Sequence, residues 1–84
     1  MREDLKKATD SYIDCTKKMD SARKFANENK ANLPVAKLQK TLDIVTKLSE
    51  QRQGDSLTIM SIIPELNDDE YIEWYGVIKP YLAE

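Results

Sequence analysis

The sequence contains no histidine, and this absence excludes most of the side-chain groupings that enzymes use. Histidine is the usual general base near neutral pH and the commonest metal ligand in proteins. Without it, the chain can form neither a Ser–His–Asp triad nor a Cys–His pair nor a Cys/His zinc site. We therefore expect no enzymatic activity, no catalytic residues, no cofactor and no metal site.

Cysteine and long apolar runs are also scarce. Cys15 is the only cysteine, so no disulfide can form within the chain. The longest uncharged run, residues 56–64, has nine residues, whereas a membrane-spanning helix needs about twenty. The N-terminal residues lack the apolar segment of a signal peptide. These features predict a protein of the cytoplasm, in a reducing environment and with no membrane partner.

Glycine and proline, which usually interrupt regular structure, are rare. Glycine occurs only at positions 54 and 76, and proline only at 34, 64 and 80. Two separated glycines leave no phosphate-binding loop of the known patterns. Abundant Lys, Glu, Asp, Leu and Ala then favour helix along the whole chain. We predict a single all-α domain over residues 1–84. It should be a small three- to four-helix bundle, with a long antiparallel helical hairpin closed by a short helix and a C-terminal aromatic helix.

The first helix is predicted over residues 3–27, where apolar and small residues recur at alternating steps of three and four. This seam comprises Leu5, Ala8, Tyr12, Cys15, Met19, Ala22 and Ala26. Such spacing is typical of a helix in a coiled coil or an antiparallel hairpin. Every second seam residue is small, so another helix could approach closely. The same seam would also offer an interface for a homodimer.

The second helix is predicted over residues 33–53. Asn32 is placed to cap its start, and Pro34 falls in its first turn. Gly54 is a suitable residue for its C-terminal end. Its apolar stripe comprises Val35, Leu38, Leu42, Val45 and Leu48, with Ile44 at the edge. A short connection to the first helix makes the two antiparallel neighbours.

A third, short helix is predicted over residues 57–63, with Asp55 or Ser56 as its cap. The segment is apolar on nearly all sides, so we expect it to be buried. Its β-branched residues would also suit a strand, but no other segment could pair with such a strand. Pro64 should end this helix.

The fourth helix has the clearest local signal. Asn67 is a good N-cap, Glu70 stands three residues later to complete a capping box, and acids occupy the first turn. Aromatic and apolar residues follow at helical steps, and we expect a kink or an end near residues 77–79 because of Pro80. The stripe comprises Tyr71, Trp74, Tyr75, Ile78 and Leu82.

Charge is divided unequally along the chain. Residues 1–53 carry twelve of the thirteen basic residues and eight acids, a balance of +4. Residues 54–84 carry seven acids and one base, a balance of −6, together with four of the six aromatic residues. An asymmetry of this kind bears on partners and orientation rather than on chemistry.

The C-terminal aromatic stripe is either core or a docking surface. Tyr and Trp are common at binding hot spots, and acids beside them favour a basic partner. Size, divided charge and the lack of catalytic groups resemble those of small regulatory or inhibitor proteins of bacteria and phages. We therefore expect a non-enzymatic interaction protein that binds and regulates or inhibits a larger protein with a basic surface. The predicted contact residues are Tyr71, Tyr75, Tyr81, Glu73, Asp69 and Trp74.

Two alternatives remain open. A nucleic-acid-binding accessory protein would use the basic residues of the first two helices, Lys6, Lys17, Lys24, Lys37 and Lys40. Acids interleaved with these lysines, and the net charge of −2, disfavour a nucleic-acid partner. A weaker alternative is a nucleotide stacked on Tyr12 at an oligomer interface.

Overall fold

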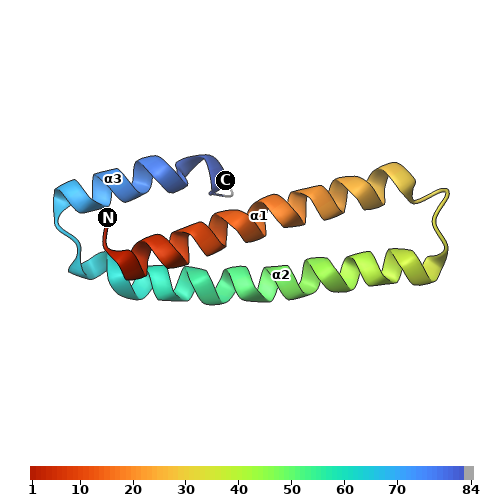
Figure 1. Ribbon diagram of the computed structural model, residues 1–84, viewed down its shortest axis with the longest axis horizontal. Helices are drawn as coiled ribbons and strands as arrows, with labels where there is room; N and C mark the ends of the chain where they lie inside the picture. Colours follow the sequence, from red (N-terminus) through yellow and green to blue (C-terminus); the bar gives the residue numbers. More distant parts are fainter. Residues whose placement is uncertain (83–84) are drawn as a thin grey trace.

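The computed structural model describes residues 1–82 and is all-α. Its helices are α1 (Glu3–Asn29), α2 (Val35–Ile62) and α3 (Asp68–Ile78), with 3₁₀ turns at Ile63–Glu65 and Lys79–Tyr81. Figure 1 shows α1 and α2 as a long antiparallel hairpin, with α3 lying back along one part of it. The molecule measures 51 × 19 × 19 Å. We call the end that carries α3 proximal and the end with the α1–α2 loop distal.

The predicted seam of α1 is the surface that packs on α2. Leu5, Cys15 and Met19 are almost completely buried, and Ala22 and Ala26 are half-buried farther along the same face. The α2 residues that face them also recur at steps of three and four, as expected for two antiparallel helices in register. Because α2 covers this seam within one chain, the seam is not a free surface for a second copy, and the homodimer stays a prediction.

Helix α2 is continuous through Gly54, so the prediction of two separate helices over this segment is wrong. Neither glycine in the described chain has a positive φ, which a glycine C-cap requires. Ile59 and Ile62 continue the seam and are buried against α1. Burying each contributes about 1.5–3 kcal/mol, more than the roughly 1 kcal/mol cost of glycine in a helix. Asp55 and Ser56 therefore lie inside α2 and cap nothing.

The apolar segment 57–63 is only partly buried, which corrects the expectation from its composition. Ile59 and Ile62 face the core, whereas Leu57 and Met60 are well exposed. Helices α1 and α3 both pack on the same side of α2 here, so its other side faces solvent. Helix α2 does end just before Pro64, as predicted.

The helix ends differ in how well local sequence predicted them. Pro34 itself stands at the N-cap of α2, and Asn32 makes no capping bond there, so that predicted cap is wrong. The capping box of α3 is confirmed, since Asn67 accepts from the Glu70 amide and the Glu70 side chain accepts from the Asn67 amide. Helix α3 ends at Ile78, two residues before Pro80, as expected.

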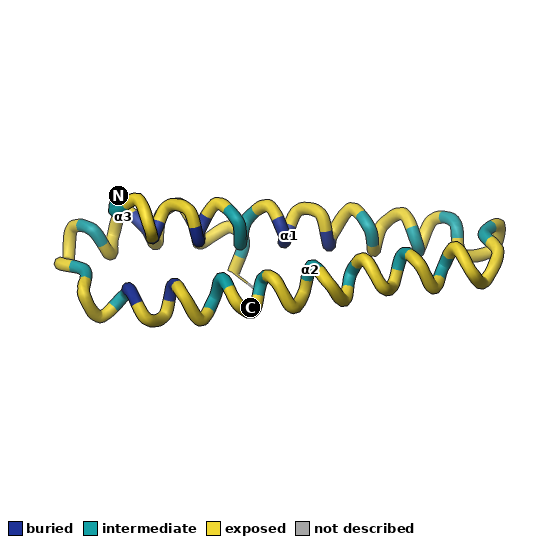
Figure 2. The backbone as a smooth tube through the Cα atoms, turned by 60° about the horizontal axis from the view of Figure 1, so that its bottom comes forward, coloured by how far each residue is buried: buried dark blue, intermediate teal, exposed yellow. Residues whose placement is uncertain are grey.

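The core lies at the proximal end, where three helices meet. It is formed by Leu5, Ala8, Ile59, Ile62, Trp74 and Ile78, with Tyr12, Ile63 and Leu66 packed against it. Figure 2 shows the buried positions gathered toward this end and the distal part of the hairpin mostly exposed. No residue between 20 and 58 is buried. Val35 and Leu42, predicted for the apolar stripe, are exposed because no third helix reaches them.

Candidate functional site

Trp74 anchors α3 to the hairpin. Its side chain is only 6% exposed, and its indole Nε1 donates a buried hydrogen bond of 3.0 Å to Thr9 Oγ1 in α1. With Ile78, one turn later, it forms the face of α3 that enters the core. Placing Trp74 in the docking surface is therefore wrong, because this residue belongs to the core.

Tyr71 and Tyr75 form an exposed surface on the flank of α3. They are 42% and 40% exposed, and their rings stack with centroids 6.2 Å apart at 15°. The Tyr71 ring also lies 5.7 Å from that of Trp74, so the pair rests on the core. Nearby Met60 and Leu82 line a cavity of about 160 Å³ with Trp74 between α2 and α3. We call Tyr71, Tyr75, Leu82 and Met60 the tyrosine face.

The other predicted contact residues lie away from the tyrosine face. Glu73 is 3.3 Å from the Met1 amino group and so turns toward the start of α1. Tyr81 is half-buried, and the Lys17 ammonium lies 5.5 Å from its ring centroid. Asp69 is exposed, but it falls about 160° around α3 from Tyr71 at 100° per residue. Asp68, two turns before Tyr75, is the acid on the tyrosine side, and its spacing of seven is the signal that could have identified it.

The lysines of the nucleic-acid alternative are all exposed, but they do not gather on one surface. Lys17 stands beside Tyr81 at the end of α3, and Lys24 pairs with Glu28 at 4.0 Å. Lys40 lies three turns before Gln51 and therefore on the same side of α2. The Gln51 amide contacts Ser11, on the side of the hairpin opposite Lys17. A phosphate backbone would therefore meet lysines on two sides and acids between them.

A layer of polar side chains crosses the middle of the hairpin. Arg52 of α2 lies with its guanidinium 5.6 Å from the Tyr12 ring centroid and donates to Thr16 Oγ1 at 3.4 Å. Ser11 donates to Asp55 Oδ2 at 2.6 Å. Polar groups inside a helix–helix seam favour one register over others. Sequence reasoning missed this layer because it ended the second helix at Gly54.

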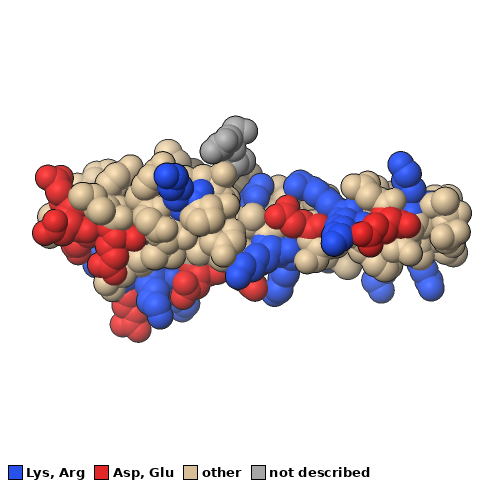
Figure 3. Space-filling view, turned by 90° about the horizontal axis from the view of Figure 1, so that it is seen from above, with Lys and Arg blue, Asp and Glu red and all other residues tan. Residues whose placement is uncertain are grey.

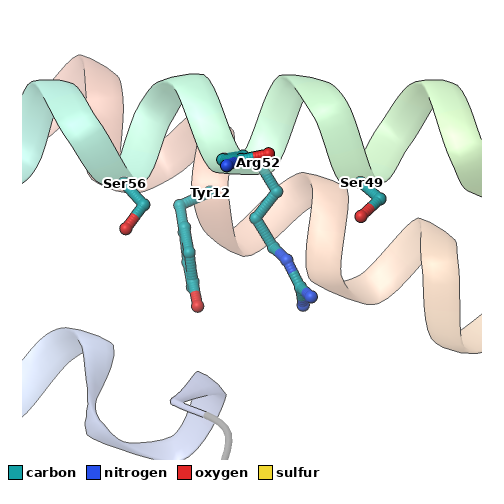
Figure 4. Close-up of a pocket in the computed structure, with 5 residues that line it drawn as sticks. Tyr12, Ser49, Arg52 and Ser56 are labelled. Atoms are coloured by element: carbon teal, nitrogen blue, oxygen red, sulfur yellow. The ribbon is translucent and has the colours of Figure 1, made fainter.

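The polar layer borders an open cavity of about 270 Å³ lined by Tyr12, Ser49, Arg52, Gln53 and Ser56. Figure 4 shows the Tyr12 and Arg52 side chains pointing toward the C-terminal turn of α3, with the two serines on either side. The arginine already lies over the Tyr12 ring, which leaves less of that ring for a stacked nucleotide. These groups can form hydrogen bonds, but they include no carboxylate and no base for proton transfer.

Cys15 is a structural residue. Its side chain is 1% exposed, and burial, followed by the nearby Asp55 charge, raises the pKa of the thiol. A raised pKa keeps the thiol protonated, and the protonated form is a poor nucleophile.

Comparison with protein-family models, with the curated proteins and with the solved structures finds no match to this chain. Within residues 1–82, no group of three or more Cys, Asp or Glu side chains is arranged to hold a metal ion. Over the same residues, no helix combines the length and apolar character needed to cross a bilayer.

Proposed function

We propose that this protein is a small, non-enzymatic interaction protein that binds a larger protein through the tyrosine face. The observation that carries the proposal is the stacked pair Tyr71 and Tyr75, each about two-fifths exposed on a capped helix. Large aromatic side chains that remain at the surface supply much of the energy of protein–protein binding.

The tyrosine face is well prepared for binding. A tyrosine has only two side-chain torsions, so it loses little conformational entropy when a partner covers it. Tyr71 already rests on the buried Trp74, which limits its movement further. Met60, 63% exposed, adds a flexible apolar side chain that adapts to irregular surfaces.

The charge around the tyrosine face favours a basic partner. Figure 3 shows acidic side chains gathered at the proximal end, where α3 begins. Some of these acids are engaged within the chain, since Glu65 pairs with Arg2 and Glu73 with the amino group of Met1. Asp68 and Asp69 are the exposed acids of the first turn of α3 that form no salt bridge with a described residue. Asp68, the one on the tyrosine side, would steer a basic surface toward the tyrosines.

Affinity capture followed by titration tests the proposal. We expect the wild-type chain to retain a protein with a basic surface, and Tyr75→Ala to weaken that complex by at least about tenfold, as at a binding hot spot. Phe25→Ala is the matched control, because Phe25 is a similarly exposed aromatic residue on the distal half.

Thermal unfolding of both variants separates binding from folding. If Tyr75→Ala lowers the melting temperature strongly and shows no separate binding defect, the tyrosines are core residues and the proposal is wrong. Equal losses of binding for Tyr75→Ala and Phe25→Ala would also contradict it.

A further inference from the structure

Helix α3 fills only the proximal part of the groove between α1 and α2. It has 11 residues, whereas α1 and α2 have 27 and 28. At 1.5 Å per residue, α3 covers about 16 Å of a hairpin of roughly 40 Å. Figure 1 shows the hairpin continuing well beyond the end of α3.

The groove continues past α3 as a series of cavities that share residues. Tyr12 and Ser56 belong both to the cavity under α3 and to the open cavity of Figure 4. Arg52 joins that cavity to one of about 410 Å³ at the last turn, lined also by Arg23 and Tyr81. Arg23 in turn joins it to a cavity of about 250 Å³ farther out. The surface that holds α3 thus continues toward the distal end as an open groove.

The distal groove is shallow and has an apolar floor. We define the distal groove by Ala22, Arg23, Ala26, Asn27, Thr41, Leu42 and Val45, with Arg52 at its proximal end. The two alanines would allow the backbone of a third helix to approach closely. Leu42 is 54% exposed and Val45 half-buried, so a helix placed here would remove apolar surface from water.

The charge of the distal groove is positive. Residues 17–50 contain eight basic residues and four acids. Arg23 and Arg52 stand on the groove beside a single acid, Asp20, and neither arginine forms a salt bridge with any residue of the described part of the chain. Two such arginines favour an occupant with carboxylates along its flanks.

Helix α3 shows what kind of segment this groove accepts. It is an amphipathic helix that inserts Trp74 and Ile78, one turn apart, into the core formed with α1 and α2. We propose that an acidic amphipathic helix of a partner protein docks in the distal groove, in line with α3, with its carboxylates at Arg23 and Arg52. The groove from Thr16 to Asn29 would accommodate about 13 residues of helix, or between three and four turns.

The distal groove is separate from the tyrosine face and has the opposite charge. A second copy of this chain is the other candidate occupant, but it would bring a second excess of basic residues against the first. Like charges placed opposite one another disfavour that pairing. Self-association is therefore an outcome that the experiment must be able to reveal.

A pair of labelled peptides tests the proposal with the full chain. Each has about 14 residues, the length set by the groove, with leucines at helical steps, and the two differ only in carrying Glu or Lys on the flanks. By fluorescence anisotropy we expect the Glu peptide to bind at least about tenfold more tightly than the Lys peptide, and less tightly at high salt.

Matched variants locate the binding site. Leu42→Asp and Arg23→Glu should each weaken binding of the Glu peptide by about tenfold or more. Ile44→Asp is the control for the first, because Ile44 is 46% exposed on the same helix but does not line the groove. Lys40→Glu is the control for the second. If circular dichroism shows that Leu42→Asp unfolds the hairpin, Arg23→Glu still tests the site, because Arg23 is at an exposed position.

Four results would overturn the proposal. These are equal binding of the two peptides, no binding of either at high micromolar concentration, equal loss in the control variants, and a dimer in sedimentation that Leu42→Asp dissociates. The last result would show that the groove is an interface between copies.

Discussion

The indole Nε1 of Trp74 in α3 donates a hydrogen bond of 3.0 Å to Thr9 Oγ1 in α1, and both side chains are buried. A buried donor and acceptor that meet only at one position fix how far α3 reaches along the hairpin, because sliding would leave both unsatisfied. Together with the packing of Ile78 in the core, this bond therefore helps to fix where the tyrosine face begins and where the open groove starts.

Breaking this bond should destabilise the fold measurably. Trp74→Phe leaves Thr9 Oγ1 without its donor, and Thr9→Val leaves the indole N–H unpaired, so each should lower the free energy of unfolding by about 1–3 kcal/mol. Urea unfolding followed by circular dichroism measures both. The double variant should lose less than the two single losses together, since both remove the same bond. If the loss in the double variant equals the sum of the two single losses, the bond contributes nothing to stability.

Replacing Gly54 should stabilise the protein. Gly54 lies inside α2 without a positive φ, and a Cβ built there has no heavy atom within 4 Å. Gly54→Ala should therefore raise the free energy of unfolding by about 0.5–1 kcal/mol. The melting temperature should rise with it. A glycine that ended a helix in the left-handed conformation would give the opposite sign, so a loss of stability would contradict the continuous helix.

The polar layer of the hairpin can be tested at Asp55. Its Oδ2 accepts from Ser11 Oγ at 2.6 Å between the two long helices. Asp55→Ala should lower the free energy of unfolding by about 1–2 kcal/mol, as for loss of a hydrogen bond to a charged group. Asp43→Ala is the control, because Asp43 is exposed on the same helix and should change stability by no more than about 0.5 kcal/mol. Equal effects of the two changes would count against a structural polar layer.

Cys15 should resist modification in the native protein. Since burial raises the pKa of its thiol, a thiol reagent such as 5,5′-dithiobis(2-nitrobenzoic acid) should react only as fast as the chain opens, and rapidly in denaturant. Because the pKa of the thiol is higher in the folded protein than in the unfolded chain, the thiol contributes less to the free energy of unfolding once the pH exceeds its ordinary value of about 8.5. The wild-type melting temperature should therefore fall more steeply above that pH than that of Cys15→Ala. Fast labelling of the native protein would contradict the buried position.

The sequence was most informative where a local rule acts alone. The seam of α1 and the capping box at Asn67 depend on spacing within a few residues, and both are present in the structure. The helix break at Gly54 was predicted wrongly because the low helix propensity of glycine costs only a small free energy. Burial of Ile59 and Ile62 against a distant part of the chain outweighs it.

The candidate site could be predicted only in part. The pattern placed Tyr71 and Tyr75 on one helix but could not separate them from Trp74, because which flank enters the core depends on where α3 meets α1. The distal groove could not be predicted from the sequence for the same reason. It exists only because α3 is shorter than the hairpin on which it lies.

The short reach of α3 also implies uneven local stability along the hairpin. Amide protons near the proximal core require a large opening before they exchange with solvent, whereas those near the α1–α2 loop are held only by two helices in contact. Protection from hydrogen exchange should decline steadily toward the loop. The two helix tips could then move apart slightly at little energetic cost, so a docked helix would tighten the part of the molecule that opens most readily.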